Sequence, residues 1–530
     1  MGALIGLHRH RGTERPGTSV AALFSDLQAA VESRYRVRLK PWYGRLLSPA
    51  KQRAVEREFL RGCDLVMGTD GALLETRRAL GLDVPVVLVA IGTLPRGDHG
   101  IRRAFPLLRP QDAVALSSEA DRELLRLHLD VCPAEQALLP FGVDTDAFRP
   151  APPEEREGFR RGFGIRSTDV LFLSVGRITA EKNVQSILTV LSSLVERRPN
   201  ARLAIAGPFA DHPFHEFGTG PFDLRALFAQ ILDARPALKA RTIFLGEVRP
   251  ASLPALYSAA DVFINLTRHH DENFGYAQVE AMACGLPVIG SDWGGLKDTI
   301  RHGETGFKVP AYVTGRGIQL DLWRALQHCD ALAASVRLRR RMGEAGRAVA
   351  EREYSLGRFR RGVLRLVERA LRRPRDRAPG SVLSDFGRRF ARAFGGLRAP
   401  VSPVFTPRTY PLYQELIRPY ATGPLEVRPP PDGAVLFATP LSYRLRRGGV
   451  EVVDVTWPGR VRLSEGERAL LRWYDRRAQP FVPVSEARRA LAGELDRAIL
   501  GLMRKGLILT SEPRSAADVA PAPVPEVAGR

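Results

Sequence analysis

Two consecutive series of short apolar runs alternate with amphipathic stretches over about the first 345 residues of the chain. Such alternation of strand and helix predicts parallel sheets covered by helices on both faces. The sequence therefore predicts an α/β protein with two such units in tandem. The expected strands of the first series are Ala3–Leu7, Leu65–Met67, Pro85–Ala90, Ala113–Leu116 and Ala137–Leu139, with helices such as Val20–Glu32 and Glu119–Leu127 between them. Those of the second series are Val170–Val175, Arg202–Ala206, Thr242–Leu245, Val262–Asn265, Pro287–Gly290 and Gly306–Val309.

A turn-rich segment from 139 to 150 separates the two series and is expected to link them. We expect a first domain over residues 1–150 and a second over 151–350, facing each other across a cleft. Ligands of sheets of this kind bind beyond the carboxyl ends of the strands. After the second series, residues 351–375 are expected to contain a further helix, Tyr354–Arg372.

The bulk composition indicates a folded, basic protein. The 530 residues, 44% of them apolar, suffice for roughly three packed domains of about 150 residues. The net charge of +21 favours acidic partners such as nucleotide phosphates, unless the arginine excess reflects only a GC-rich genome. The first residues hold too short an apolar run for a signal peptide, and the four cysteines show neither metal nor disulfide spacing. We therefore expect a cytoplasmic protein.

The segment around Glu272 and Glu280 carries the strongest chemical signal in the sequence. Seven residues separate the two glutamates, and a helix of small residues carries the second and ends at Gly285. We expect this helix to begin near Gly275, so that its free N–H groups and the positive end of its dipole face the preceding loop. That arrangement suits an anion such as a phosphate.

A second candidate for anion binding follows the expected strand Val170–Val175. The strand ends at Gly176, and the cations Arg177 and Lys182 follow with four residues between them. A glycine lets a phosphate approach the backbone closely, and two cations can neutralise charge that develops on a leaving group. Alone, such a pair is usually a solvated loop, so its significance comes from the glutamate segment downstream.

Together these motifs resemble the retaining glycosyltransferases of family 4, which have the GT-B fold of two Rossmann-like lobes. The resemblance covers about residues 1–375 and is densest in the second series, where Tyr257–Phe263, Ser291–Gly295 and Gly303–Phe307 also match. It implies that the helix Tyr354–Arg372 crosses back to the first lobe. It implies transfer of a sugar from a nucleoside-diphosphate sugar to an acceptor hydroxyl, without a metal ion or any other cofactor. The acceptor could be a glycan, a lipid-linked glycan, a peptide or a small molecule.

The resemblance also assigns roles to individual residues. It implies that Arg177 and Lys182 bind the donor diphosphate beside Gly176. It further implies that Glu272 contacts the transferred sugar and that Glu280 binds the ribose hydroxyls. Arg177, Lys182 and Glu272 are thus the expected catalytic residues. The remaining members of the expected donor site are the loop residues Asn273, Phe274 and Gly275.

The first series departs from the family pattern. Ile91 stands where the family often has a histidine near the reaction centre, which puts one catalytic contact in doubt. The family's pair of glycines before the first helix is matched only by Gly17. His8 and His10 are expected at the end of the first strand, facing the cleft. They could supply the missing polar group on the acceptor side, or they could be ordinary surface residues.

Other interpretations of the two glutamates stay open. They could be the acid/base pair of a hydrolase, whose carboxyls stand roughly 5–9.5 Å apart. Eight helical residues would separate them by about 12 Å, which favours separate contacts on one extended donor. They could also be surface acids on an amphipathic helix. Finally, a chain with an altered first lobe could be a non-catalytic, nucleotide-sugar-binding regulator with a C-terminal DNA- or protein-interaction module.

Residues 376–460 are expected to be a basic linker that contains one amphipathic helix, over 382–397. Phe386, Phe390 and Phe394 lie on one stripe of that helix. The stripe could lie in the anionic inner face of a membrane, as a peripheral contact, or it could pack on the enzyme.

Residues 461–511 are expected to form a small, mainly helical module that resembles a winged helix. Ser464 and Glu467 predict a capping box at the start of its first helix. Charges of both signs on its third helix argue against DNA binding, so a protein- or peptide-docking module or a structural cap is expected. The tail 512–530 is expected to be disordered.

Overall fold

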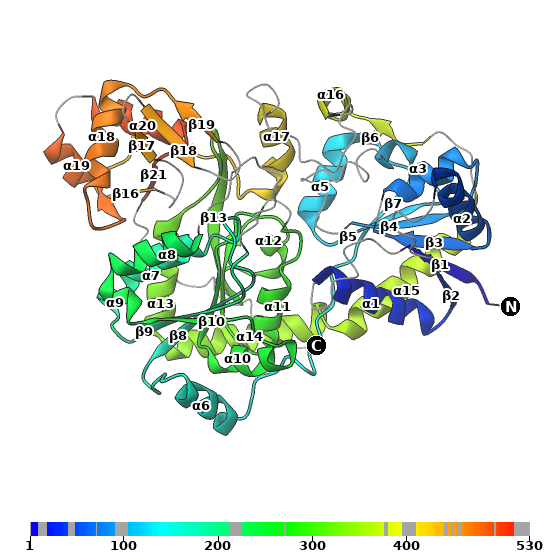
Figure 1. The fold of residues 1–530 in the computed structure, drawn as a ribbon, viewed down its shortest axis with the longest axis horizontal. Helices are drawn as coiled ribbons and strands as arrows, with labels where there is room; N and C mark the ends of the chain where they lie inside the picture. The colour runs from blue at the N-terminus through cyan, green and yellow to red at the C-terminus, as the bar shows by residue number, and fades with distance from the viewer. Residues whose placement is uncertain are drawn as a thin grey trace, which may run out of the picture. The chain divides into compact units, whose positions relative to one another are not determined.

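The computed structural model of the chain forms two compact units. Unit 1 comprises Met1–Thr145, His270–Tyr276 and Ala350–Tyr420, and unit 2 comprises Asp146–His269, Ala277–Val349 and Ala421–Arg530. Each unit contains one large, mainly parallel sheet (Figure 1). The residues that the structure describes are 2–8, 19–40, 48–69, 71–90, 104–210, 224–269, 272–375, 380–394, 410–438, 444–446, 449–453, 458–491 and 494–512.

The sheet of unit 1 has six strands in the order β2-β1-β3-β4-β5-β7, and every neighbouring pair is parallel. All but β2 lie within two residues of the strands expected from the sequence. The edge strand β2 was missed because it is only four residues long, although its alternation of arginine with apolar residues is typical of a half-buried strand. The bounds are β1 (Leu4–His8), β2 (Arg36–Leu39), β3 (Leu65–Gly68), β4 (Val86–Val89), β5 (Ala113–Leu116) and β7 (Glu135–Leu138).

Helices α1 (Ser19–Glu32) and α15 (Leu356–Arg372) pack against each other in unit 1, although they are far apart in the sequence. The buried face of α15 carries Phe359, Val363 and Leu366 at helical spacing, which predicts this packing. The other helices of this part of unit 1 are α2 (Pro49–Arg61), α3 (Ala72–Ala79), η2 (Phe105–Leu107) and α5 (Glu119–His128).

The sheet of unit 2 has seven strands in the order β10-β9-β8-β11-β12-β13-β14, parallel except for the pair β13–β14. The chain runs outward from β8 to β10 and then returns to the other side of β8 for β11. The strand order therefore reverses between β8 and β11. The bounds are β8 (Val170–Val175), β9 (Ala201–Ala206), β10 (Thr242–Gly246), β11 (Val262–Asn265), β12 (Val288–Asp292), β13 (Gly306–Thr314) and β14 (Gly317–Leu320).

Helices cover both faces of this sheet, with α7 and α13 on one side and α11 and α12 on the other (Figure 1). The helix α7 is buried along almost its whole length, which explains its high content of Leu, Ile and Val. The bounds are α6 (Pro153–Gly162), α7 (Val184–Arg197), α8 (Leu224–Asp233), α9 (Pro236–Lys239), η4 (Pro250–Ser252), α10 (Leu253–Ala259), α11 (Tyr276–Ala283), α12 (Leu296–Thr299), α13 (Leu322–Ala334) and α14 (Val336–Glu353).

The expected amphipathic helix exists as α16 (Asp385–Phe394), and it packs on unit 1. Phe386 and Phe390 are 4% and 5% exposed and surround the ring of His128 on α5, at centroid distances of 5.1 and 5.6 Å. Just before α16, β15 (Val382–Leu383) pairs with β6 (Leu129–Val131). Of the two alternatives expected for the stripe, the structure therefore shows that Phe386 and Phe390 pack on the protein and are not exposed. The side chain of Phe394 is outside the described residues.

The segment 376–460 contains more structure than the linker expected from the sequence. Besides α16, it includes α17 (Tyr410–Ile417) and η5 (Arg418–Tyr420), followed by β16 (Val435–Phe437). These elements are only three to eight residues long, so a periodic pattern does not identify them securely, although Tyr413, Leu416 and Ile417 are buried at helical spacing. A second small antiparallel sheet is formed by β17 (Arg444–Arg446), β18 (Gly449–Val453) and β19 (Pro458–Val461).

The C-terminal module consists of three helices and a three-stranded antiparallel sheet in the order β20-β16-β21. Ser464 and Glu467 form both hydrogen bonds of the capping box, which confirms that expectation. Leu470, Ile499 and Ile508 lie in its hydrophobic core. The resemblance of this module to a winged helix stays a prediction. The bounds are α18 (Glu465–Asp475), β20 (Val482–Pro483), α19 (Val484–Ala490), α20 (Leu495–Arg504) and β21 (Leu509–Ser511).

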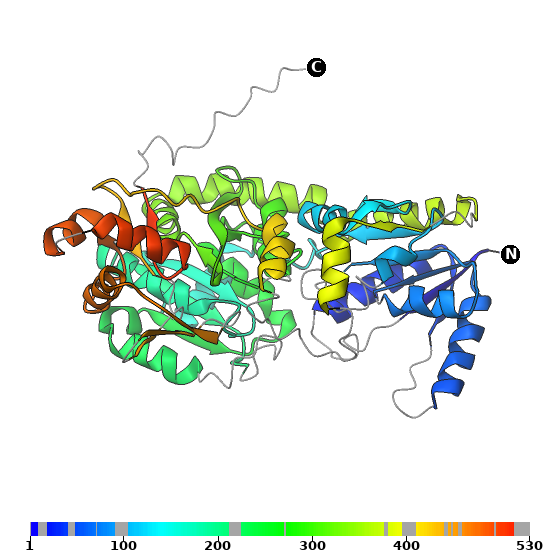
Figure 2. The same ribbon diagram turned by 90° about the horizontal axis from the view of Figure 1, so that it is seen from above.

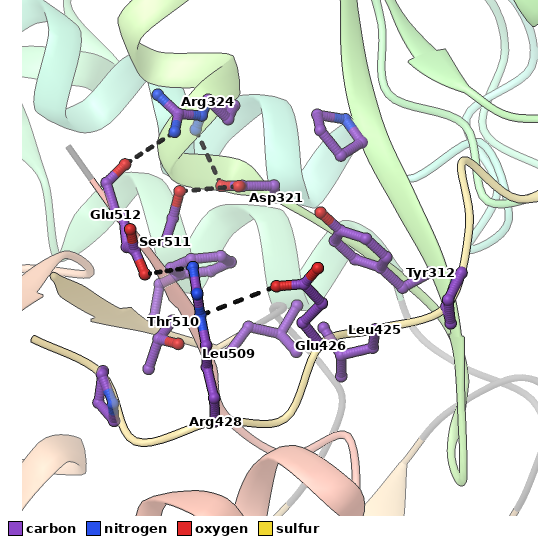
Figure 3. A pocket seen from close by; sticks show the side chains of 14 residues that line it. Tyr312, Asp321, Arg324, Leu425, Glu426, Arg428, Leu509, Thr510, Ser511 and Glu512 are labelled. Atoms are coloured by element: carbon purple, nitrogen blue, oxygen red, sulfur yellow. Dashed lines mark hydrogen bonds and ion pairs between the residues drawn. The ribbon is translucent and has the colours of Figure 1, made fainter. Parts of the chain in front are cut away.

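The C-terminal module docks on the β13–β14 hairpin and the start of α13, all within unit 2 (Figures 1 and 2). The Ser511 hydroxyl donates to the buried Asp321 carboxylate at 2.8 Å, and Arg324 donates to the backbone oxygen of Glu512 at 2.8 Å. An added Cβ on Gly506 would lie 2.3 Å from Oγ1 of Thr314, so the two segments approach closely. A cavity of about 470 Å³ lies beside this junction, with Arg428 paired to Glu512 within it (Figure 3).

Candidate functional site

The loops that follow β8 and β11 carry most of the expected donor-site residues. The two strands are hydrogen-bonded neighbours, and they are the pair between which the strand order reverses. In open parallel sheets, ligands bind beyond the carboxyl ends of the strands at such a reversal. The fold of unit 2 thus brings the loop 176–183 and the chain leaving Asn265 to the edge where a ligand is expected.

Gly176 begins the first loop in a conformation that favours glycine. Its φ is 145°, and an added Cβ would meet no heavy atom within 4 Å. Gly207, on the neighbouring loop, approaches so closely that its own added Cβ would lie 1.9 Å from the carbonyl oxygen of Gly176. Arg177 is exposed and Lys182 is half-buried. The loop therefore combines open space beside the backbone with two cations, which suits an anionic group.

Three hydrogen bonds join the first loop to the chain that leaves β11. The side-chain amide of Asn183 donates to the carbonyl oxygen of Leu266 at 2.8 Å. The carbonyl oxygen of Glu181 accepts from the backbone N–H of Arg268 at 2.8 Å and from the hydroxyl of Thr267 at 3.2 Å. The sequence analysis assigned no role to these residues, because the bonds join segments more than 80 residues apart and each of them uses a backbone group.

Asn183 also explains why the loop ends where it does. It is fully buried, has a φ of 58°, and is the N-cap of α7. Asparagine tolerates this left-handed conformation better than most residues. Its Oδ1 accepts from the hydroxyl of Ser186 at 2.8 Å, so both ends of the amide are used. An asparagine directly before an apolar helical run is a recognised helix-start signal, and it could have identified the loop end in the sequence.

The loop after β11 is held from its other side by β12 and the turn that follows. The hydroxyl of Ser291 donates to the carbonyl oxygen of Thr267 at 2.8 Å, and the indole of Trp293 donates to that of His269 at 2.9 Å. Ser291 and Trp293 belong to a segment that matched the family pattern in the sequence. Their role in the structure is to fix the backbone that leads to Glu272.

The glutamate motif begins with a short loop and continues as α11. Glu272 is half-buried, and the carbonyl oxygen of the buried Asn273 accepts from the hydroxyl of Ser117 at 2.9 Å. Phe274 is 2% exposed and contacts an aromatic cluster with Phe141, Tyr276 and Tyr354, at centroid distances of 5.4, 5.0 and 5.8 Å. Phe274 therefore anchors the loop rather than lining open space.

The helix of the motif starts where the sequence indicated. Gly275 has a φ of 82°, which favours glycine, and α11 begins at the next residue, Tyr276. Because Glu272 precedes the helix, the rise per residue of a helix does not measure its separation from Glu280.

Glu280 lies on α11 and is hydrogen-bonded to a buried tyrosine. The hydroxyl of Tyr257 donates to its Oε2 at 2.8 Å. Burial raises the pKa of the Glu280 carboxyl to about 7, although the hydrogen bond from Tyr257 opposes this shift. A ligand that donates hydrogen bonds to the ionised carboxylate would therefore bind better above neutral pH.

Of the residues expected on the acceptor side, the structure describes only His8, and it does not place His8 as expected. His8 ends β1, but it is only 6% exposed and its Nε2 lies 2.8 Å from Nζ of Lys40, which also pairs with Glu56. His8 was expected to end the first strand and to face the cleft; it does end the strand, but its side chain is buried. The reason is that α2 and the residue Lys40 cover this end of the strand. His10, Gly17 and Ile91 lie outside the described residues.

Among the residues that the structure describes, no group of three or more His, Cys, Asp or Glu side chains is arranged to hold a metal ion. Within the same residues, no helix combines the length and the apolar character needed to cross a membrane.

Comparison with known proteins agrees with the architecture of unit 2. The family model of glycosyl transferases group 1 matches residues 155–348. An uncharacterized glycosyltransferase of Methanocaldococcus jannaschii is 33% identical over 156 residues, which are 29% of this chain and 36% of that protein. A D-inositol 3-phosphate glycosyltransferase of Segniliparus rotundus is 27% identical over 286 residues, 54% of this chain and 58% of that protein. The chain thus spans between about a third and three fifths of the length of these relatives.

Solved structures show the same fold over a longer part of the chain. A glycosyltransferase from Rickettsia africae has a TM-score of 0.55 at 15% identity, covering 70% of this chain and 100% of that one. Anabaena HepE in complex with UDP has a TM-score of 0.54 at 17% identity, covering 69% and 99%. The fold is the GT-B fold of glycosyltransferases, with two Rossmann-like sheets.

Proposed function

We propose that this chain is a glycosyltransferase that moves a sugar from a nucleoside-diphosphate sugar to an acceptor hydroxyl, with retention of configuration and without a metal ion. One observation carries the proposal. The loop with Gly176, Arg177 and Lys182 is hydrogen-bonded to the chain that leads into the glutamate motif, at the point where the strand order of unit 2 reverses. The family match over 155–348 includes both segments and supports it.

In the proposed donor complex, the diphosphate lies beside Gly176. The open space at its Cα admits a phosphate oxygen close to the backbone. Arg177 and Lys182 pair with the phosphates and neutralise the charge that develops as the sugar departs. The backbone of Asn273–Gly275 and the N-terminus of α11 add N–H donors and a positive dipole end.

The two glutamates contact different parts of the donor in this proposal. Glu280, oriented by Tyr257, accepts hydrogen bonds from the ribose hydroxyls. Glu272 contacts the transferred sugar. The acceptor hydroxyl attacks from the face that the diphosphate leaves, and a donor phosphate oxygen takes its proton. In this scheme the cations and the helix dipole serve in place of a metal ion.

The first experiment is thermal stabilisation of the purified chain by UDP-, GDP- and ADP-sugars. GDP-mannose belongs in the panel because one matched relative, from Corynebacterium glutamicum, is named as a GDP-mannose-dependent mannosyltransferase. UDP-glucose belongs there because HepE was solved with it. A selective shift with one nucleotide, abolished in Arg177→Ala/Lys182→Ala, supports the donor site. No shift with any donor in a folded sample contradicts it.

The proposed retention of configuration and the proposed independence from a metal ion need separate measurements. With the selected donor, NMR of the released or transferred sugar reports its anomeric configuration, and inversion would refute the retaining assignment. Turnover in excess EDTA should match that in buffer. If the donor binds but no acceptor or water consumes it, the chain is instead a regulator that senses nucleotide sugars.

A further inference from the structure

A buried chain of hydrogen bonds links the glutamate motif to Tyr420, wholly within unit 1. Tyr420 ends the extension that follows α15, which we define as α16, α17 and η5. The hydroxyl of Ser117 lies 2.9 Å from the carbonyl oxygen of Asn273 and 3.1 Å from Oδ2 of Asp121. The hydroxyl of Tyr420 donates to Oδ1 of Asp121. Ser117, Asp121 and Tyr420 are 3%, 1% and 0% exposed. The chain therefore runs from Tyr420 to the backbone of the motif through two side chains shielded from water.

The proton of Ser117 has two acceptors in this chain. A serine hydroxyl carries a single proton, and it can point either to the Asp121 carboxylate or to the carbonyl of Asn273. A carboxylate is the stronger acceptor, so it competes for that proton. The hydrogen bond from Tyr420 to the other oxygen of Asp121 weakens this competition. Ser117 can then donate to Asn273, which fixes the backbone next to Glu272.

Tyr420 comes from a part of the chain outside the segment that matches the family model, which ends at 348. It ends η5, directly after α17, and both elements pack on α5, the helix that carries Asp121. Arg389 on α16 pairs with Glu415 on α17 at 2.9 Å, which joins the two helices of the extension. The hydroxyl of Tyr420 is thus held against α5 by the packing of α17 and η5 on that helix.

We propose that Tyr420 is a positioning residue for the Glu272–Gly275 loop and acts through Asp121 and Ser117. Its consequence for sugar transfer rests on the proposed function, because Glu272 is assigned there to the sugar. Nucleotide binding should be affected less than transfer, since Arg177, Lys182 and Glu280 lie outside this loop and also hold the nucleotide in that proposal. The extension would thereby determine how well the loop is ordered for transfer.

The direct test is hydrogen–deuterium exchange of the amides from 272 to 283 in the full chain. Tyr420→Phe removes one hydroxyl from a buried site without changing the ring, and Ser117→Ala removes the last link. The matched control is Tyr474→Phe, whose hydroxyl donates to the Pro480 carbonyl at 2.6 Å and accepts from the Ala438 N–H at 3.1 Å in the C-terminal module. We expect exchange about tenfold faster in both test variants and unchanged in the control.

A kinetic measurement separates positioning from general stability. With the donor identified by thermal stabilisation, Tyr420→Phe should lower the rate of donor turnover about tenfold and weaken the affinity for the nucleoside diphosphate by a clearly smaller factor. Unchanged exchange at 272–283 in both test variants would overturn the positioning role. Faster exchange in a chain whose wild type binds no donor would support the positioning role and refute the proposed function, so the two failures are distinguishable.

Discussion

The side-chain amide of Asn183 donates a hydrogen bond of 2.8 Å to the carbonyl oxygen of Leu266, and this bond joins the loops that follow two neighbouring strands. Asn183 is at the start of α7, while Leu266 is the first residue after β11. Because both partners are buried, the bond forms away from competing water. A single asparagine therefore aligns the cationic loop with the chain that leads to the glutamate motif.

Asn183→Ala should lower the free energy of unfolding by about 2–4 kcal/mol. Alanine loses the bond to Leu266 and is strained by about 1–2 kcal/mol at a φ of 58°. Asn183→Gly loses the same bond but tolerates the backbone, so the difference between the variants measures the strain. Chemical denaturation measures the free energy of unfolding of the wild type and of both variants. The control Asn200→Ala, which removes an exposed bond to Thr168, should cost less than about 1 kcal/mol. If Asn183→Ala and Asn200→Ala lowered the free energy of unfolding equally, the hydrogen bond between Asn183 and Leu266 would not be a stabilising one.

Arg177→Ala and Lys182→Ala should each weaken binding of the selected nucleoside diphosphate by about 10- to 100-fold. Each removes one charge-assisted contact with phosphate and leaves the backbone of the loop intact. Isothermal titration at two salt concentrations should also show a weaker salt dependence for each variant. Lys239→Ala is the control, because Lys239 pairs with Asp233 on an exposed surface. Loss of nucleoside binding as well would indicate an unfolded loop rather than a lost phosphate contact.

Glu280 should make stability depend on pH in the window from 4.5 to about 7. Burial raises its pKa above the unfolded value of 4.5, so the folded state holds the proton more tightly. The stabilisation is fully present below pH 4.5 and is lost as the pH rises through about 7, at a cost of roughly 3 kcal/mol or less. Glu280→Gln should flatten this part of the pH profile of the melting temperature. Tyr257→Phe removes the hydrogen bond that opposes the rise in the Glu280 pKa. In that variant the stabilisation should therefore be lost at a higher pH than in the wild type.

The same carboxyl should make nucleotide binding stronger in mild alkali. Ribose hydroxyls donate to the ionised form, so affinity should rise about tenfold between pH 6 and pH 8, and Glu280→Gln should bind with little pH dependence in that range. Titration calorimetry in two buffers of different ionisation enthalpy would also detect the released proton. An affinity that is independent of pH in the wild type contradicts a ribose contact by Glu280.

Ser511→Ala should lower the free energy of unfolding of the docked C-terminal module by about 1–3 kcal/mol. It leaves the buried Asp321 carboxylate without the hydroxyl that donates to it at 2.8 Å. Glu512→Ala, one residue later, removes only an exposed ion pair with Arg428 and should cost less than about 1 kcal/mol. Limited proteolysis within residues 421–430 should accordingly be faster in Ser511→Ala than in Glu512→Ala. If both variants behave alike, the module is held mainly by apolar packing.

The parts of the fold that could be predicted are those whose signal is local. The strands β8 and β11 begin and end where their apolar runs do, and the capping box of Ser464 and Glu467 formed as its spacing indicated. Gly275 and the start of α11 were also placed correctly, because a glycine before a helix of small residues is a strong marker. The buried strands of both units needed nothing beyond their own composition.

The parts that could not be predicted depend on partners far away in the sequence. Tyr257 and Glu280 are joined across 23 residues, and Tyr420 reaches Asp121 across 299. A tyrosine in a run of apolar residues gives no sign of such a contact. His8 was misplaced for the same reason: its burial depends on Lys40, which follows a strand that the sequence analysis missed. The roles of Arg177, Lys182 and Glu272 themselves stay predictions, since they concern a bound ligand.

The central position of β16 between β20 and β21 sets a boundary for producing the C-terminal module separately. β16 precedes the first helix of the module by more than twenty residues, yet both of its partners follow that helix. A fragment that starts at 461 would contain all three helices and two unpaired strand edges, which expose backbone groups and invite aggregation. A fragment that starts before Pro430 would retain the strand that joins them. Ribosomal synthesis meets the same constraint, because β16 can pair only with β20 until the last strand, β21, has been made.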